Sequence, residues 1–294
     1  MEHSLISIPN DSNLAGRLGK KGSENGVTFY NRRDGDRVFV IIAPTNPETK
    51  FNAVAETLTI SDNVLISTAK LDRLFAESII GCSLLGKRIT LTQDNDASEI
   101  MKVSKIAYET VAESEVFGHF GNADSKDSVE PIVEVDHAFN VKGIGTVLLG
   151  IVRQGTVRVH DSLYMGDGRA VGIRSIQSQD QDVQEAGRST RVGLAVKGVE
   201  PDDIEKGDIL SSRQMAKIDK ISANVRVSGM VKEKHFDYSE LWLVCGFRSS
   251  LCRVTLEGNS YGISLSARLS LSRGDNFLLV RKSEPRIFAS GSVL

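Results

Sequence analysis

The sequence is poor in aromatic residues and has no long apolar run. Only 6% of its 294 residues are aromatic, so its cores must consist mainly of valine, isoleucine and leucine. No uninterrupted apolar stretch approaches the roughly 18–20 residues that a membrane-spanning helix requires. The first four residues also lack the basic start of a signal peptide. These absences predict a cytoplasmic protein that has no membrane partner.

Cysteine and histidine are few and dispersed. Three cysteines form no Cys-x-x-Cys pair, and their odd number does not suggest a disulfide framework. The histidines lack metal-ligand spacing, and no Ser/His/Asp, Cys/His or paired-carboxylate arrangement is present. We therefore expect a reduced protein with no metal site and no catalytic residues of these kinds. The residues concerned are Cys82, Cys245, Cys252, His3, His119, His137, His160 and His235.

Charge is unevenly distributed along the chain. The net charge is −2, which argues against a protein that binds nucleic acid over its whole surface. Residues 1–128 carry 14 Lys and Arg against 18 Asp and Glu, and residues 129–212 carry 9 against 13, which gives −4 for each segment. Residues 213–294 carry 13 against 7, or +6. The last third therefore has either an ordinary solvated surface or a surface for an acidic partner.

Strand and helix signals alternate in the first third. Short runs rich in valine and isoleucine occur at 5–8, 38–43, 63–68 and 88–92, as in the buried strands of a parallel sheet. Helical periodicity lies between them. One helix is predicted to begin at Asn46 with Pro47 in its first turn, a second covers 71–82, and a third opens at Asp96. In the third, Ile100, Val103 and Ile106 share a face. The alternation predicts a doubly wound α/β domain over residues 1–128.

Helical periodicity disappears after residue 120. Residues 118–128 are polar and contain glycine, so they are predicted to form a linker. Short β-rich runs separated by Gly, Asp, Asn and Ser follow, which is typical of small barrels. The run pauses near 211–220 and resumes, and alternate positions from Ile263 to Leu271 are apolar. Two β-barrel domains are predicted, at 129–212 and 213–294.

The middle segment carries several linked motifs. A turn with Gly143 and Gly145 is followed by Thr146-Val147 and two later glycines, and Ile-Arg-Ser-Ile-Gln follows at 173–177. Further motifs follow in order at 185–187, 191–199 and 203–210. This pattern resembles the second domain of elongation factor Tu and its selenocysteine-specific relative, SelB. The chain is most similar to the archaeal SelB-like group labelled EF-Pyl. The resemblance implies a shortened GTPase-like domain followed by two β-barrels.

The GTPase motifs of that family are degenerate in this chain. A phosphate loop needs Gly-x-x-x-x-Gly-Lys followed by Ser or Thr, and residues 19–22 and 27–30 do not complete one, because Leu14 and Lys21 stand at key positions. Residues 81–87 match the spacing, but Arg88 replaces the hydroxyl residue and the segment is predicted to end a helix and enter a strand. The Asp-x-x-Gly motif is absent at 42–46. At 93–96 the guanine-reading motif retains only Asp96, which also suits a helix cap.

The resemblance therefore implies a translation elongation factor-like protein that binds aminoacyl-tRNA, the ribosome or another translation factor. Because the nucleotide motifs are degenerate, we expect that GTPase activity is lost and that neither GTP nor magnesium binds tightly. Gln177 corresponds to the acidic residue that lines the terminal adenosine of tRNA in elongation factor Tu. Gln179 would share its face on a regular strand, although simple surface exposure is an alternative for both. Candidate contacts to the tRNA backbone are Arg248, Arg253, Arg268, Arg273, Arg281 and Lys282.

Two other functions are compatible with the sequence. One is a working GTPase with divergent loops, which would have to bind phosphate without a recognisable cradle. The other is a protein-interaction scaffold that binds no nucleic acid. Nucleotide titration separates the working GTPase from the other two functions. Salt-dependent RNA binding separates the translation factor-like protein from the scaffold.

Overall fold

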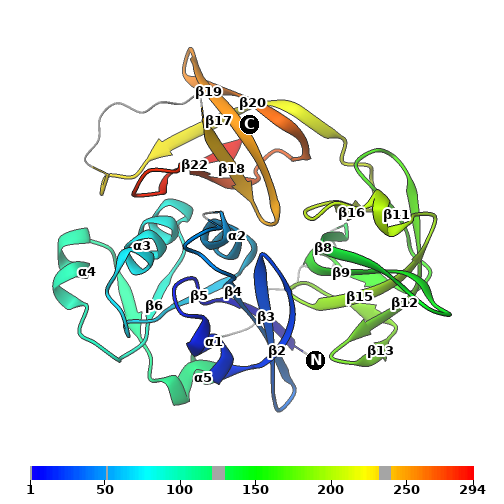
Figure 1. Cartoon of the computed structure of the whole chain (residues 1–294), viewed down its shortest axis with the longest axis horizontal. Helices are drawn as coiled ribbons and strands as arrows, with labels where there is room; N and C mark the ends of the chain where they lie inside the picture. Colours follow the sequence, from blue (N-terminus) through cyan, green and yellow to red (C-terminus); the bar gives the residue numbers. More distant parts are fainter. Residues whose placement is uncertain (1, 51, 121–129, 232–239) are drawn as a thin grey trace.

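Three units surround a common centre in the computed structural model, which describes residues 2–50, 52–120, 130–231 and 240–294 (Figure 1). The first is an α/β unit, residues 2–120. The second is the middle barrel, from Ile132 to Ser211, and the third is the C-terminal barrel, from Lys217 to Val293. The predicted linker at 118–128 begins inside a helix that ends at His119, and its residues 121–128 lie outside the described residues.

The α/β unit is built on a seven-stranded sheet in the order β2-β3-β4-β1-β5-β6-β7. β1 pairs in parallel with β4 and β5, and β6 and β7 continue the parallel part, whereas β3 pairs antiparallel with β2 and β4. The four predicted strands correspond to β1, β4, β5 and β6 and are confirmed. The strands are β1 (Glu2–Ser7), β2 (Lys20–Asn25), β3 (Val27–Asp34), β4 (Arg37–Pro44), β5 (Asn63–Ile66), β6 (Ile89–Leu91) and β7 (Tyr108–Thr110).

Helices cover both faces of this sheet. α1 and α5 pack with Ile6, Ile41 and Leu65 on one face, and α2 and α3 pack with Val64 and Ile66 on the other. The alternation of Val64, Leu65 and Ile66 between the faces follows from the two-residue period of a strand. The helices are α1 (Ser12–Leu18), α2 (Ala53–Ile60), α3 (Arg73–Leu85), α4 (Ser98–Ser104), η1 (Glu113–Glu115) and α5 (Val116–His119).

Two helix predictions in this unit are wrong in detail. Asn46 has a left-handed φ of 49° and its carbonyl accepts turn hydrogen bonds, so it starts no helix, and α2 begins at Ala53. The apolar face predicted for α4 is also wrong, because Val103 is 81% exposed and Met101 is the buried residue. Met101 is the residue of α4 that packs into the apolar cluster formed by α2 and α3.

The middle barrel forms a sheet in the order β11-β16-β8-β9-β15-β12-β13, and β11 also pairs with β12, which closes six of the strands into a ring. Gly143 and Gly145 have φ values of 84° and 94° in the hairpin between β8 and β9, as the two-glycine turn predicts. The elements are β8 (Ile132–Val141), β9 (Gly145–Gln154), β10 (Val157–Arg158), β11 (Ser162–Tyr164), β12 (Ala170–Ser178), β13 (Gln181–Val183), β14 (Glu185–Ala186), β15 (Arg191–Lys197), η2 (Pro201–Asp203) and β16 (Ile209–Ser211).

The C-terminal barrel is closed in the order β17-β20-β19-β18-β21-β22. The predicted alternation in β20 places Ile263, Leu265 and Leu269 in the core, but Ala267 is exposed because the pairing of β17 with β20 shifts register between these positions. The strands are β17 (Lys217–Val227), β18 (Leu241–Cys245), β19 (Arg248–Glu257), β20 (Ser260–Ser270), β21 (Asn276–Val280) and β22 (Ile287–Val293). Both predicted barrels are therefore present.

The units share core packing. Figure 1 shows α2 and α3 on the side of the α/β unit that faces the C-terminal barrel. One apolar cluster contains Leu58 and Phe75 from these helices together with Val244, Leu278 and Ile287 from the barrel. A smaller cluster joins all three units, because it contains β3 and β4 side chains with Ile151 and Phe247. The interfaces are thus continuous with the cores of the units.

Candidate functional site

A cavity of about 580 Å³ lies between the α/β unit and the middle barrel. The first unit contributes residues of β1, β3 and β4, and the barrel contributes the end of β12, β13, β14 and the segment that follows. Valine and alanine side chains form part of its wall beside polar groups. The lining residues are Glu2, His3, Arg33, Val38, Ser178, Gln179, Gln181, Val183, Glu185, Ala186, Gly187, Arg188 and Thr190.

Gln179 lines this cavity because the chain turns sharply after β12. Gln179 and Asp180 have φ values of 54° and 58°, and Ser178 pairs with Gln181, which defines a two-residue hairpin between β12 and β13. Two consecutive left-handed residues match the twist of such hairpins. The Nε2 of Gln179 donates to Oδ1 of Asn31 in β3 at 3.1 Å. The side chain therefore bridges the barrel and the α/β unit.

Gln177 lies elsewhere. Its side chain is exposed on β12, and its Nε2 donates to Oδ1 of Asp182 at 2.9 Å. Because β12 ends at Ser178, Gln179 is not on the same strand as Gln177, and the expected shared strand face is wrong. The structure therefore brings only Gln179 to the cavity.

Three buried polar atoms around the cavity have no hydrogen-bond partner within the described residues: Nδ1 of His3, Oγ of Ser178 and Oγ1 of Thr190. Thr190 is 1% exposed and Ser178 is 8% exposed. Burial, followed by the nearby amino terminus, lowers the pKa of His3 to about 4, so His3 is neutral at pH 7. Buried polar groups are rarely left unpaired in a folded protein. Their concentration here suits a ligand that supplies hydrogen-bonding groups.

The charged residues of the cavity are partly neutralised. Arg188 forms an ion pair with Asp62 at 2.5 Å, and Ser189 also bonds to that carboxylate. Arg33 donates to the carbonyl of Gly35 at 3.1 Å. Within the described residues, neither arginine forms an ion pair with a carboxylate that lines the cavity.

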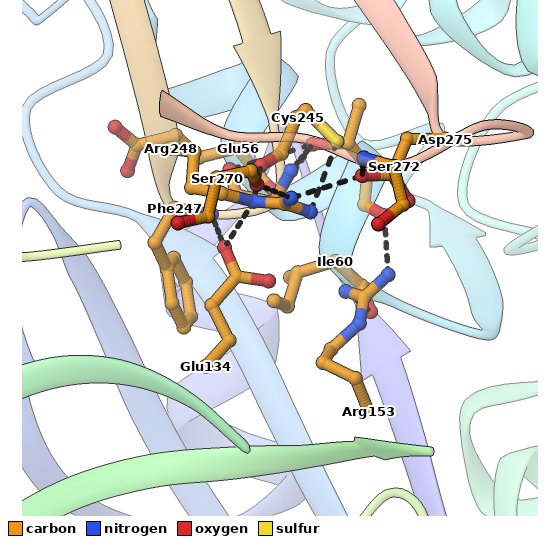
Figure 2. A network of polar contacts seen from close by, with 12 residues as sticks. Glu56, Ile60, Glu134, Arg153, Cys245, Phe247, Arg248, Ser270, Ser272 and Asp275 are labelled. Carbon is orange, nitrogen blue, oxygen red and sulfur yellow. Dashed lines mark hydrogen bonds and ion pairs between the residues drawn. The ribbon is translucent and has the colours of Figure 1, made fainter. Parts of the chain in front are cut away.

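Arg248 does not belong to a basic surface, which corrects its selection as a tRNA backbone candidate. It is 6% exposed and lies where β18 turns into β19, inside the polar network of Figure 2. Its Nη1 donates to Oδ2 of Asp275 at 3.0 Å, and its Nε lies 3.6 Å from Oε1 of Glu134 in the middle barrel. Glu134 also accepts from the backbone N–H of Phe247 at 2.5 Å. Arg248 therefore joins the two barrels.

The other backbone candidates lie nearer the surface. Arg253, Arg273 and Lys282 are exposed. Arg268 is exposed as well and lies 3.7 Å from Asp219. Arg281 is half-buried, donates to the carbonyl of Pro285 at 3.1 Å and covers the ring of Phe288. These contacts hold Arg281 against its own barrel.

The N-terminus of α1 has its first amide groups satisfied by the protein itself. Asp11 is the N-cap, and its Oδ1 accepts hydrogen bonds from the backbone N–H groups of Asn13 and Leu14, each at 3.0 Å. Its Oδ2 accepts from Oγ of Ser67, just beyond β5, at 2.8 Å. Helix N-termini bind phosphate through such amide groups. The carboxylate of Asp11 already occupies the position that a phosphate would take at this helix. The segment follows β1, which lies beside β5 where the strand order reverses.

The segments tested as phosphate loops have other places in the fold. Gly19 caps the C-terminus of α1, and the lysines after it enter the edge strand β2, at the opposite end of α1 from Asp11. Residues 81–87 end α3 and lead into β6, which confirms the predicted helix-to-strand context. Gly86 has a φ of 65° as the C-cap of α3.

The segment 93–96 is used in local hydrogen bonds. Asn95 donates its amide to the carbonyl of Thr68 at 2.9 Å, and Asp96 accepts from the N–H of Ser98 at 2.8 Å near the start of α4. That bond is the first cause of a lowered pKa for Asp96. Asp96 therefore bonds to the first residue of α4 but is not its cap, because the N-cap is Ala97 and α4 begins two residues later than predicted.

Sequence reasoning missed Asp11, His3 and the two unpaired hydroxyl groups. Asp11 had a recognisable signal, since an acidic N-cap residue precedes the apolar helix positions Leu14 and Ala15. Ser178 and Thr190 had none, because their importance depends on burial between two units. In the described part of the chain, no group of three or more His, Cys, Asp or Glu residues could hold a metal ion, and no helix is both long and apolar enough to span a membrane.

Residues 145–211 match the family model described as Elongation factor Tu domain 2. An uncharacterised protein of Methanocaldococcus jannaschii is 28% identical over 277 residues, which cover 90% of this chain and 90% of that protein. The selenocysteine-specific elongation factor of the same organism is 32% identical over 206 residues. Those residues cover 66% of this chain and 44% of that factor. These findings support the translation factor family.

Solved structures share the fold. Translation elongation factor SelB from Methanococcus maripaludis, in its apo form, has a TM-score of 0.80 at 20% identity, over 100% of this chain and 79% of that chain. A bacterial selenocysteine-specific elongation factor has a TM-score of 0.81 at 14% identity, over 99% of this chain and 58% of that chain. At 20% and 14% identity, these likenesses show that the fold is shared.

Proposed function

We propose that this protein is an elongation factor-like protein of the cytoplasm that binds the 3′ end of an aminoacyl-tRNA and does not hydrolyse GTP. The observation that carries the proposal is the cavity at Gln179. Three buried polar atoms around it have no hydrogen-bond partner within the described residues. A nucleoside with an attached aminoacyl ester offers several hydrogen-bond donors and acceptors at this end. That chemistry suits the two hydroxyl groups and the neutral imidazole of His3.

The absence of GTP hydrolysis is proposed on separate grounds. The sequence lacks a phosphate loop, and the carboxylate of Asp11 accepts the amide hydrogen bonds that a phosphate would require. A phosphate placed there would also meet a like charge. The resemblance to the SelB-like group labelled EF-Pyl, and the role with an aminoacyl-tRNA that it implies, are carried over here as a proposal.

The exposed basic residues of the C-terminal barrel are proposed to contact the tRNA backbone. Arg253, Arg268, Arg273 and Lys282 remain candidates because their side chains are exposed. Lysine and arginine contacts to phosphate release counterions, so such binding weakens steeply with salt. The cavity would then select the 3′ end, and the barrel would supply affinity that does not depend on sequence.

GTP is expected not to bind at micromolar concentration. The motivation is the combined loss of the phosphate loop, the magnesium-binding hydroxyl and the guanine-reading motif. A titration with fluorescent GTP and magnesium measures this directly. A dissociation constant in the micromolar range or below would contradict the proposal and restore the divergent GTPase.

Replacement of Thr190 by valine is expected to weaken binding of the aminoacylated 3′ end by roughly 5–10-fold, the loss of about one hydrogen bond. Stability should be unchanged or slightly higher, because the variant removes a buried hydroxyl that has no protein partner. Filter binding compares aminoacyl-tRNA with the same tRNA lacking its terminal nucleotide.

Gln177→Ala is the matched control, because Gln177 lies on the same barrel outside the cavity. It should bind both tRNAs as the wild type does. Equal behaviour of Thr190→Val and Gln177→Ala, or equal affinity for intact and truncated tRNA, would remove the cavity from the proposed function.

A further inference from the structure

The two edges of the seven-stranded sheet differ in how they are protected against pairing with another strand. β2 forms one edge and carries Lys20, Lys21 and a break in its register with β3, features that discourage pairing. β7 forms the other edge, and its sequence Tyr-Glu-Thr contains no lysine or proline. Within the described residues, no strand covers its outer side. The β7 edge is therefore open to another strand.

The backbone groups at this edge point away from the protein. The N–H of Val111 donates to the carbonyl of Leu91 in β6 at 2.9 Å, so it points into the sheet. Because successive residues of a strand direct their backbone groups to opposite sides, those of Tyr108 and Thr110 point outward. Within the described residues these outward N–H and carbonyl groups form no hydrogen bond. A strand placed beside β7 would pair with them.

Apolar side chains accompany the open edge. α4 connects β6 to β7, and its Val103 is 81% exposed, more than any other large apolar side chain of the described residues. Ile100 lies three residues earlier on the same side of the helix and is also exposed, as is Tyr108. Tyr108 and Ser98 line one hollow, so the tyrosine lies on the same face of the sheet as α4. Grouped apolar residues of this kind mark a protein interface.

We propose that β7 pairs with β7 of a second copy of this chain, antiparallel and about a two-fold axis. The outward groups fix the register, because Tyr108 of each copy then exchanges hydrogen bonds with Thr110 of the other. The axis passes beside Glu109, and both α4 helices lie on one face of the joined sheet. Ile100 and Val103 of the two copies then shield one another from water. Such a two-fold interface is self-complementary and closes at two chains.

The charges at the edge favour a second copy over a different partner. Oε1 of Glu109 lies 3.9 Å from Nη1 of Arg88, whose side chain is 78% exposed. The two-fold axis brings the two Glu109 side chains opposite each other, which is unfavourable without neutralisation. It also brings in both Arg88 side chains, so the paired edges contain two carboxylates and two guanidinium groups. The edge therefore matches a copy of itself in charge.

The proposed interface is separate from the cavity at Gln179. The β2–β3 end of the sheet contacts the middle barrel, for example through Asn31 and Gln179, and β7 is at the opposite end. Figure 1 shows α4 on the side of the α/β unit away from the middle barrel. The dimer therefore leaves the cavity of each copy open. The inference goes beyond the proposed function and does not depend on it.

Sedimentation velocity of the full-length protein, at concentrations up to about 100 μM, measures the association. The mass of the wild type should approach that of two chains as concentration rises. Thr110→Pro removes an outward N–H that does not bond to β6, at an edge position where proline is tolerated. It should raise the dissociation constant of the dimer roughly 10–30-fold, because each copy loses one hydrogen bond.

Val103→Lys should also weaken the dimer, because it places a lysine of each copy in the apolar contact. Its matched control is Leu256→Lys, which changes a 69% exposed leucine of the C-terminal barrel and should leave the dimer intact. Circular dichroism checks that each variant is folded. If Thr110→Pro is not folded, Val103→Lys decides the result.

Cross-linking tests the register. The three cysteines of the chain are buried, so Glu109→Cys supplies its one exposed thiol. In the proposed register the two residues 109 form a non-hydrogen-bonded pair, with Cα atoms roughly 4.5–5.5 Å apart, which a disulfide can bridge. Oxidised glutathione should convert this variant to a covalent dimer. Leu256→Cys, with a thiol on the C-terminal barrel, should remain unlinked.

Three results overturn the proposal. The first is a wild type that stays monomeric at every concentration, which is also the result if the edge pairs only with a strand of a different protein. The second is a dimer that Thr110→Pro and Val103→Lys leave unchanged. The third is equal cross-linking of Glu109→Cys and Leu256→Cys, because that indicates random collision.

Discussion

Replacement of Arg286 by methionine is expected to lower the free energy of unfolding by about 3–5 kcal/mol. Arg286 precedes β22 and is 4% exposed, and its partner Glu77 in α3 is 1% exposed. Nε of Arg286 donates to Oε1 of Glu77 at 2.9 Å, and Nη2 donates to Oε2 at 2.6 Å. The variant would leave a carboxylate buried without its cation. Urea unfolding followed by circular dichroism measures the effect.

Arg73→Met provides the comparison, because Arg73 also joins α3 to the C-terminal barrel but at the surface. Its partners Glu48 and Glu284 have exposed side chains, so the loss should stay within about 1 kcal/mol. The double variant Glu77→Leu/Arg286→Met should recover much of the stability, since apolar side chains can replace a buried pair. If Arg286→Met costs no more than Arg73→Met, the buried pair does not stabilise this interface.

The Glu77–Arg286 pair lies in an interface that binds the α/β unit firmly to the C-terminal barrel. Arg226 of β17 donates to the carbonyls of Ser83 and Leu84 at the end of α3, at 3.0 and 2.9 Å. Ser290 donates to the carbonyl of Leu84 at 3.0 Å. These contacts surround an apolar cluster shared by both units. The α/β unit therefore shares both a polar and an apolar interface with the C-terminal barrel.

The sequence predicted the parts of the fold that depend on local pattern. Short valine- and isoleucine-rich runs became β1, β4, β5 and β6, because burial on both faces requires apolar residues at every position. The edge strand β2 was missed, since its residues are mostly exposed and polar and its pairing with β3 is what makes it a strand. The start of α2 was misplaced because Asn46-Pro47 satisfies a helix-start rule while its contacts form a turn.

The candidate site was less accessible from sequence. Gln179 was named for its spacing from Gln177, but the hairpin at Gln179-Asp180 lacks the glycine that usually announces such a turn. Thr190 and Ser178 could be identified as candidate ligand contacts only from the structure, in which both are buried and line the cavity between the α/β unit and the middle barrel. Charge alone also could not separate exposed arginines from Arg248, because burial between two barrels depends on residues distant in sequence, such as Glu134.

Replacement of Arg248 by methionine is expected to separate stability from RNA binding. The free energy of unfolding should fall by about 3–5 kcal/mol, because Glu134 and Asp275 would lose a buried cation between the barrels (Figure 2). The salt dependence of tRNA binding should stay unchanged at a temperature where the variant is folded, since the guanidinium is inaccessible to phosphate. Chemical unfolding and filter binding at several salt concentrations give the two quantities.

The matched comparison is Arg253→Glu/Arg273→Glu, which changes two exposed residues of the same barrel. This variant should lose little stability, because neither side chain forms an ion pair within the described residues, and it should flatten the salt slope by about one unit or more per lost contact. The opposite pattern, with a slope altered by Arg248→Met and left intact by the exposed reversals, would place the RNA backbone on another surface. Arg248 and the exposed arginines carry the same charge. The expected difference in salt slope therefore follows from the burial of Arg248 and the exposure of Arg253 and Arg273.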